Sequence, residues 1–217
     1  MSEDGKPRRR YDSSRRVQQA QQSRRDVLAT ARTLFLRNGY APTKLAEIAA
    51  ESGVSVETIY KAFTNKAGLL KALFDVAVAG DDEPVAMADR DEIRAIIAEP
   101  DPARKLEMYA EHSATAMARV APIQVLVRGA ATTDPAVDAV WRKTRDELLN
   151  AMTQFAHDLR ATGRLRNALP SGQVRDILWT SFSLELYELL VLERQWPPGR
   201  YAAFVADLAK HALLGPS

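Results

Sequence analysis

Apolar residues recur every three or four positions along nearly the whole chain, and no segment alternates between apolar and polar residues over a sustained stretch. The first pattern is typical of helices that bury one face, whereas the second would indicate half-buried strands. The sequence therefore predicts an all-α protein of about nine or ten helices.

The N-terminal third contains capping and helix-breaking residues that delimit four helices. Asn38-Gly39 is expected to end the first helix, and Gly53 the second. Ser55 is placed to cap the third helix, and Asn65 the fourth. The expected ranges are about 24–38, 43–52, 56–63 and 66–79.

A strongly polar stretch at 81–84 follows the fourth helix and coincides with a change in charge. We therefore expect a domain boundary there, between an N-terminal domain over 21–81 and a larger C-terminal domain over 84–217. Proline- and glycine-containing breaks divide the second domain into about six helices. These breaks lie at 99–102, 121–122, 134–135, 169–172 and 197–199.

The last two predicted helices carry more apolar residues than one core-facing side can bury. The stretch 174–193 is apolar most of the way round, and 201–213 has a continuous apolar face. This pair could meet its own copy as a four-helix dimer interface, or the first helix could be the buried centre of a monomer. The residues expected at the interface are Leu178, Phe182, Leu189, Tyr201, Phe204 and Leu208.

The composition excludes several classes of chemistry. The 217 residues are 46% hydrophobic and 27% charged, which is typical of a globular protein, and none is cysteine. The three histidines are far apart and no glycine-rich phosphate loop or nucleophile motif occurs, so we expect neither an enzyme nor a metal or cofactor. No secretory signal or membrane span is apparent, so a cytoplasmic protein without a membrane partner is expected.

Two short helices joined by Ser52-Gly53-Val54-Ser55 have the shape of a helix-turn-helix over about 44–63. On a helical projection of the second of them, Ile59 and Phe63 share an apolar side opposite a polar side. The polar side carries Glu57, Thr58 and Lys61. An apolar anchor opposite hydrogen-bonding groups suits a helix that reads base edges in the major groove. Glu57 and Lys61 could instead form an ion pair on a solvated face.

Positive charge is concentrated near the same element. Residues 1–70 contain 13 Lys and Arg against 7 Asp and Glu, whereas residues 71–217 contain 17 against 21. This distribution predicts a polyanion partner for the N-terminal third. Residues 1–20 are expected to be a disordered basic arm that follows DNA phosphates or enters a minor groove, or else a solubilising tail. The arginines assigned to this arm are Arg8, Arg9, Arg10, Arg15 and Arg16.

The segments TKLAEIA (43–49), GVS (53–55), TIYKAF (58–63) and NKAGLL (65–70) resemble the DNA-binding domain of the TetR/AcrR family of bacterial transcriptional regulators. The resemblance covers about 23–70, and 84–217 share only length and helical character with the family. It implies a three-helix DNA-binding domain followed by a helical domain for effector binding and dimerisation. The implied function is a repressor that binds a palindromic double-stranded DNA operator as a homodimer and is released by an effector.

The resemblance also implies roles for individual residues. Thr43 and Lys44, at the start of the second helix, would lie beside a phosphate, and Lys66, in the first turn of the fourth, would contact another. Ser55 would cap the recognition helix, and Tyr60 would offer its hydroxyl to the DNA backbone. Base preference does not carry over, because Glu57, Lys61 and Ala62 depart from the commoner family pattern. The residues assigned to the DNA interface are Thr43, Lys44, Ser55, Val56, Glu57, Thr58, Tyr60, Lys61 and Lys66.

The C-terminal domain is larger than dimerisation alone requires, which leaves room for an apolar small-molecule effector between its helices. Bulky and adaptable side chains would suit such a lining, with ordinary core packing as the alternative for each. The candidates are Met108, Tyr109, His112, Met117, Trp141, Phe155, Trp179 and Phe182. A DNA-binding dimer regulated by a protein partner, without a small-molecule effector, is the alternative function.

Overall fold

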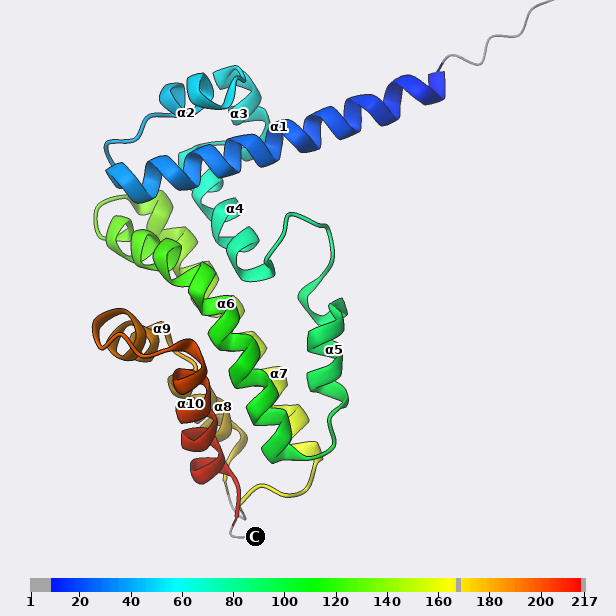
Figure 1. Ribbon diagram of the computed structural model, residues 1–217, viewed down its shortest axis with the longest axis vertical. Coiled ribbons are helices and arrows are strands. Elements are labelled where there is room, and N and C mark those ends of the chain that lie inside the picture. Colours follow the sequence, from blue (N-terminus) through cyan, green and yellow to red (C-terminus); the bar gives the residue numbers. More distant parts are fainter. Residues whose placement is uncertain (1–8, 167–168, 216–217) are drawn as a thin grey trace, which may run out of the picture. The chain divides into compact units, whose positions relative to one another are not determined.

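The computed structural model describes residues 9–166 and 169–215, and for 9–14 it describes the backbone alone (Figure 1). Within these ranges every extended regular element is a helix, which confirms the predicted all-α class, and one isolated antiparallel bridge joins Leu165 to Leu214. The elements are α1 (Arg9–Asn38), α2 (Leu45–Ser52), α3 (Val56–Phe63), α4 (Lys66–Ala79), a 3-10 turn η1 (Met87–Asp89), α5 (Asp91–Ala98), α6 (Pro102–Ala131), α7 (Pro135–Ala161), α8 (Ser171–Ser181), α9 (Leu184–Tyr187), a π-helical turn η2 (Glu188–Glu193) and α10 (Pro198–Leu213). None of the helices described is both long enough and apolar enough to cross a lipid bilayer.

The chain divides into two compact units, Met1–Leu73 and Phe74–Ser217. The division falls inside α4, before the boundary expected at 81–84, because the second half of α4 packs with the C-terminal unit. Phe74 and Ala77 are buried, and the Ala77 carbonyl accepts a hydrogen bond of 3.2 Å from Arg119 Nε on α6. The polar stretch therefore follows the end of α4 and does not mark the edge of the compact units.

The N-terminal unit is built around a small apolar core that α1, α2 and α3 share. Helix α1 contributes a fully buried stripe, α2 contributes Ile48 and Ala49, and α3 contributes Ile59 and Phe63. The buried stripe of α1 is Val27, Leu28, Ala31, Leu34 and Phe35. Since helices of eight residues are unstable alone in water, this shared core holds α2 and α3 in place.

Helix α1 begins at Arg9 and not near residue 24, so residues 9–20 of the predicted disordered arm are helical. The segment lacks glycine and proline, and a hydrogen bond from Gln22 Nε2 to Asp26 Oδ1 (2.9 Å) joins successive turns. Extending a helix that is already nucleated costs far less than starting one. The buried C-terminal half of α1 therefore stabilises the helical conformation of its exposed N-terminal half. The amino-acid composition alone does not predict this effect.

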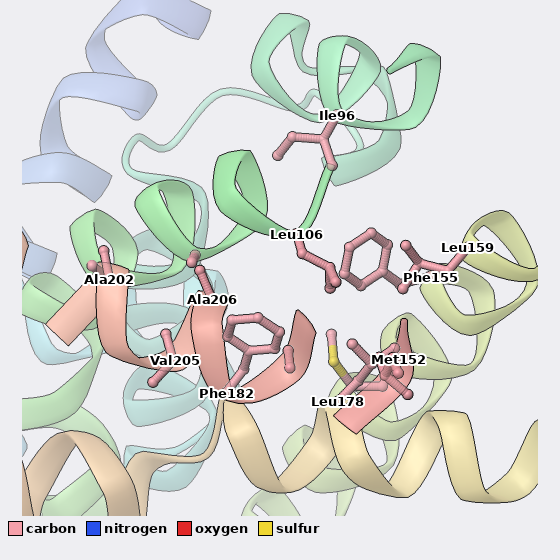
Figure 2. Packing of buried hydrophobic residues seen from close by; sticks show 14 of the residues in the cluster. Ile96, Leu106, Met152, Phe155, Leu159, Leu178, Phe182, Ala202, Val205 and Ala206 are labelled. Carbon is pink, nitrogen blue, oxygen red and sulfur yellow. The ribbon is translucent and has the colours of Figure 1, made fainter. Parts of the chain in front are cut away.

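The C-terminal unit is a bundle in which α6 packs against α7 and α10, and α7 packs against α8. Figure 2 shows side chains from α6, α7, α8 and α10 turned toward one another, among them Leu106, Phe155, Leu178 and Phe182. This cluster is the main core of the unit, and Ile96 of α5 also belongs to it.

Two predictions about the C-terminal helices are wrong. A break was expected at 121–122, but α6 continues through Pro122, with Ala121 and Ile123 fully buried on either side. Packing on both sides of the proline offsets the missing hydrogen bond, which typically costs about 3 kcal/mol. Conversely, the helix expected over 174–193 is interrupted, because the Ser183 hydroxyl caps a new helix by accepting from Leu186 N at 3.3 Å.

Candidate nucleic-acid interface

The start of α3 is fixed by its capping residue, as the sequence predicts. Ser55 has an extended backbone, and its hydroxyl oxygen accepts a hydrogen bond from Thr58 N at 3.2 Å. Gly53 ends α2 with φ of +70°, a conformation that glycine adopts without strain. The turn between α2 and α3 therefore has the local structure of a helix-turn-helix.

The outward face of α3 is polar and accessible. Ile59 is fully buried, whereas Thr58, Tyr60 and Lys61 are exposed and Val56 is half-buried at the edge. Tyr60 keeps 52% of its surface exposed, so its hydroxyl is free to face a partner and is not part of the core. The side chains expected to meet bases and phosphates thus share one solvent-facing surface.

Glu57 differs from its neighbours because its carboxylate is engaged at the start of α3. Hydrogen bonds from its own backbone N–H and from the Ser55 hydroxyl lower the pKa of Glu57 below its usual range. The predicted alternative, an ion pair with Lys61, does not occur among the residues described by the structure. These interactions favour the ionised form of Glu57, whose negative charge suits the N-terminus of a helix.

The three residues expected beside phosphates differ in accessibility. Lys44 is exposed at the N-cap of α2, where a cation can reach a backbone phosphate. Thr43 is only 1% exposed, and its hydroxyl donates to Gly39 O at 2.8 Å. The phosphate role expected for the Thr43 side chain is therefore wrong, because that hydroxyl fixes the turn between α1 and α2.

Lys66, the third of these residues, already has contacts inside the N-terminal unit. Its Nζ atom donates to Ala41 O at 3.1 Å and lies 4.2 Å from the centre of the Tyr40 ring. These contacts attach the first turn of α4 to the turn between α1 and α2. If Lys66 also contacts a DNA phosphate, it does so in addition to this structural role.

The arginines of the arm are only partly described. Arg15 and Arg16 are exposed on α1, the side chains of Arg9 and Arg10 are not described, and Arg8 lies outside the described residues. Arg15 and Arg16 therefore project from a helix and not from an extended segment.

Most of the residues predicted to line an effector site gather around the core of the C-terminal unit. The Tyr109 ring stacks on Phe155 at 4.5 Å between centroids and meets Phe182 edge-on at 4.8 Å. His112 lies 6.4 Å from Tyr109, and burial lowers the pKa of this histidine below its usual range. Met108, Met117 and Trp179 pack against the same cluster from partly exposed positions.

Trp141 does not belong to this cluster. It is half-buried, and the exposed Arg145 guanidinium lies 5.4 Å from its ring and 5.1 Å from the ring of Trp179. The two tryptophans therefore share a surface cation, and the effector role predicted for Trp141 has no support from its position.

Half of the residues predicted for the dimer interface are inaccessible. Leu178 and Tyr201 are 0% exposed and Phe182 is 3% exposed, because all three belong to the buried core of one protomer. The expectation for these three is wrong. Leu189, Phe204 and Leu208 are 51%, 41% and 41% exposed, which leaves them accessible to a partner.

Two features of the C-terminal unit were missed from sequence. Arg119 on α6 donates to the last turn of α4, and Tyr201 of α10 has a fully buried hydroxyl without a hydrogen-bond partner in the described part of the chain. A sequence pattern marks both simply as members of amphipathic helices. Their partners come from distant elements, so no local signal could have identified them.

Comparison with known proteins supports the assignment of the N-terminal unit. A family model described as bacterial regulatory proteins, tetR family, matches residues 27–73. The HTH-type transcriptional regulator TtgR of Pseudomonas putida is 41% identical over 61 residues, which are 28% of this chain and 29% of that protein. The chain is thus matched over less than a third of the length of this curated relative.

Solved structures extend the similarity in fold to most of the chain. FadR from Bacillus subtilis, solved in complex with stearoyl-CoA, superposes with a TM-score of 0.68 at 18% identity over 85% of this chain and 96% of that one. NalD of Pseudomonas aeruginosa, a secondary repressor of the MexAB-OprM efflux pump, gives 0.68 at 16% identity over 91% and 100%. The match over residues 27–73 agrees with the capped α2–α3 turn and the exposed face of α3, so this segment is similar to the TetR family of bacterial regulatory proteins.

Proposed function

We propose that this protein is a transcriptional regulator, and not an enzyme, that binds a palindromic DNA operator as a homodimer and is released by a small-molecule effector. The observation that carries the proposal is the accessible face of α3, where Thr58 and Lys61 stand opposite the buried Ile59. A helix of this size fits the major groove, and lysine can donate to the acceptor edge of guanine.

Lys44 supports the same placement, since it lies exposed at the start of α2 on the other side of the turn. A cation there would contact a phosphate and fix the register of α3 without reading sequence. Binding as a symmetric pair would place two copies of α3 about 34 Å apart, in successive major grooves. Such DNA would be met in the bacterial cytoplasm.

Repression and release by a ligand are supported by relatives of similar fold. NalD is named as a repressor and FadR was solved with stearoyl-CoA. A ligand releases DNA only if it binds the DNA-incompetent conformation more tightly, typically by about 1–3 kcal/mol. Helix α4 starts in the N-terminal unit and ends in the C-terminal one, so it is the covalent link through which this preference would act.

The proposal is tested by retardation of DNA from the region upstream of its own gene, with unrelated DNA as competitor. Lys61→Ala removes a contact to a base and should weaken specific binding by about 1–3 kcal/mol, or roughly 5- to 150-fold. Because Lys61 is exposed, the thermal midpoint should stay unchanged.

Lys143→Ala, which removes an exposed lysine from α7, is the matched control and should bind DNA like the unchanged protein. The proposal fails if no upstream DNA is retarded. It also fails if Lys61→Ala and Lys143→Ala bind equally well.

A further inference from the structure

The hydroxyl of Tyr201 is the polar group in the C-terminal core whose hydrogen-bonding capacity is unused. Tyr201 is 0% exposed, and its oxygen has no hydrogen-bond partner among the described residues. Nearly all buried polar groups in proteins form hydrogen bonds, and a buried donor without an acceptor is rarer than a buried acceptor without a donor. This hydroxyl therefore points to a partner that the chain itself does not supply.

The surroundings of this hydroxyl come from three elements. Tyr187 of α9 meets the Tyr201 ring edge-on at 5.1 Å, and Tyr109 of α6 stacks within the same core. Burial raises the pKa of Tyr201 above its usual range, and the phenols of Tyr187 and Tyr109 raise it further. Tyr201 thus remains a protonated donor throughout the physiological range, in a region that it shares with two other phenols.

Several charged side chains on the helices that carry Tyr109 and Tyr201 are engaged in ion pairs or with backbone carbonyls. Buried Lys105 donates to Ile97 O at 2.8 Å, and Arg119 Nε donates to Ala77 O at 3.2 Å. Lys210 Nζ lies 3.0 Å from Glu107 Oε1, and Arg128 forms a bidentate pair with Glu188 at 2.9 and 2.7 Å. Burial lowers the pKa of His112 below its usual range, which favours the neutral imidazole. A charged ligand group in this core would have to be desolvated or to take its partner from one of these contacts, whereas a neutral acceptor would need neither.

We infer that Tyr201 donates its hydroxyl hydrogen to a neutral oxygen acceptor, such as a carbonyl, ether or hydroxyl oxygen, on an otherwise apolar effector. The inference rests on the proposed function and deepens it by naming the class of ligand. The apolar body of the ligand would lie against the Tyr109, Phe155 and Phe182 rings, which are already packed together. The acceptor would satisfy the buried donor on α10.

The predicted ligand class is tested with three probes that share a nine-carbon chain. They are the neutral 2-nonanone, the anion nonanoate and the cation nonyltrimethylammonium. Their affinities for the full-length protein are measured by calorimetric titration, and release of upstream DNA is followed in parallel. We expect 2-nonanone to bind most tightly. Tyr201→Phe should weaken its binding by about 3- to 10-fold, the usual effect of one neutral hydrogen bond.

The stability of the unliganded variant separates a ligand contact from a structural one. Because Tyr201→Phe removes an unpaired buried hydroxyl and keeps the ring, its thermal midpoint without probe should be equal to or above that of the unchanged protein. Thr133→Val, which removes an exposed hydroxyl from the turn between α6 and α7, is the control and should leave the affinity for 2-nonanone unchanged.

The inference is overturned if Tyr201→Phe binds 2-nonanone with unchanged affinity, if a charged probe binds more tightly, or if none of the probes binds. A lower thermal midpoint of the unliganded variant would also overturn it, because the hydroxyl would then serve a structural partner such as an ordered water. Failure of the unliganded protein to retard upstream DNA counts instead against the proposed function, whatever the probes do.

Discussion

Gly68 determines how closely α4 can follow α3. The turn between them holds Thr64 at a φ of +67°, and Asn65 Oδ1 accepts a hydrogen bond from Gly68 N at 2.8 Å. A Cβ atom at position 68 would lie 2.1 Å from the carbonyl oxygen of Phe63, which is far inside contact distance. Since that neighbour is backbone, the turn itself would have to open to admit a side chain.

We expect Gly68→Ala to reduce the free energy of unfolding by about 1–3 kcal/mol, the usual cost of forcing atoms into a packed site. The comparison is Gly129→Ala on the exposed side of α6, where no atom lies within 4 Å of the added methyl group. There alanine should be neutral or stabilising by about 0.5–1 kcal/mol, because it favours a helix. Urea denaturation of both variants measures the difference, and equal effects would contradict the assigned role of Gly68.

At the same scale, the sequence predicted the residues with local partners and missed those with distant ones. The capping role of Ser55 follows from its position before an amphipathic segment, and its partner is only three residues away. Burial of Thr43 depends on how the chain turns back onto α1, which the pattern of residues does not specify. The exposure of Lys61 was predictable because the period of a helix fixes its direction.

Among the elements, the N-terminal half of α1 changes how the basic arm can meet DNA. Residues 15–22 are exposed along a helix, and a helix with side chains is about 10–12 Å wide. The minor groove is about 6 Å wide, so this segment cannot enter it without unfolding. In its helical form it can reach phosphates through side chains such as Arg15.

Removal of residues 1–20 should therefore weaken operator binding through charge alone. The logarithm of affinity against that of salt concentration should become shallower by about 0.9 for each phosphate that the shortened protein no longer neutralises. The thermal midpoint should hardly change, because the buried stripe of α1 begins at Val27. Arg15→Gln preserves the helix and should give part of the same effect, whereas an unchanged slope after truncation would exclude the arm from the interface.

Element boundaries were predictable where one residue dominates the local energetics. Asp134 and Pro135 start α7 as expected, since the Asp134 carboxylate accepts from Ala136 N at 2.9 Å. The break predicted at Pro122 does not occur, because the packing of α6 outweighs the cost of the proline. The helix start at Ser183 was not predicted, because this capping residue lies within an apolar stretch. Both outcomes depend on contacts between elements, which periodicity along one segment cannot reveal.

For the whole molecule, the exposed apolar residues of η2 and α10 are the best candidates for a symmetric interface. Phe204 and Leu208 lie one turn apart on α10, and Leu189 and Leu192 lie on the adjoining η2. The Phe204 ring also meets Trp196 edge-on at 5.6 Å. An apolar surface of this kind, contributed by two neighbouring elements, is typical of a site of protein association.

Phe204→Glu should convert a dimer to a monomer, because a symmetric interface would bury the introduced charge twice without a partner. An uncompensated buried charge typically costs about 3–5 kcal/mol, enough to raise the dissociation constant by at least about 100-fold. Sedimentation velocity at several concentrations measures the change, with Ile97→Glu on α5 as a control that alters a residue of similar exposure. A monomer made in this way should keep its thermal midpoint, since Phe204 is already 41% exposed, but should lose tight binding to a palindromic site. If Phe204→Glu stays dimeric, or if the unchanged protein is already a monomer, the two copies of α3 cannot be brought to one operator through this surface.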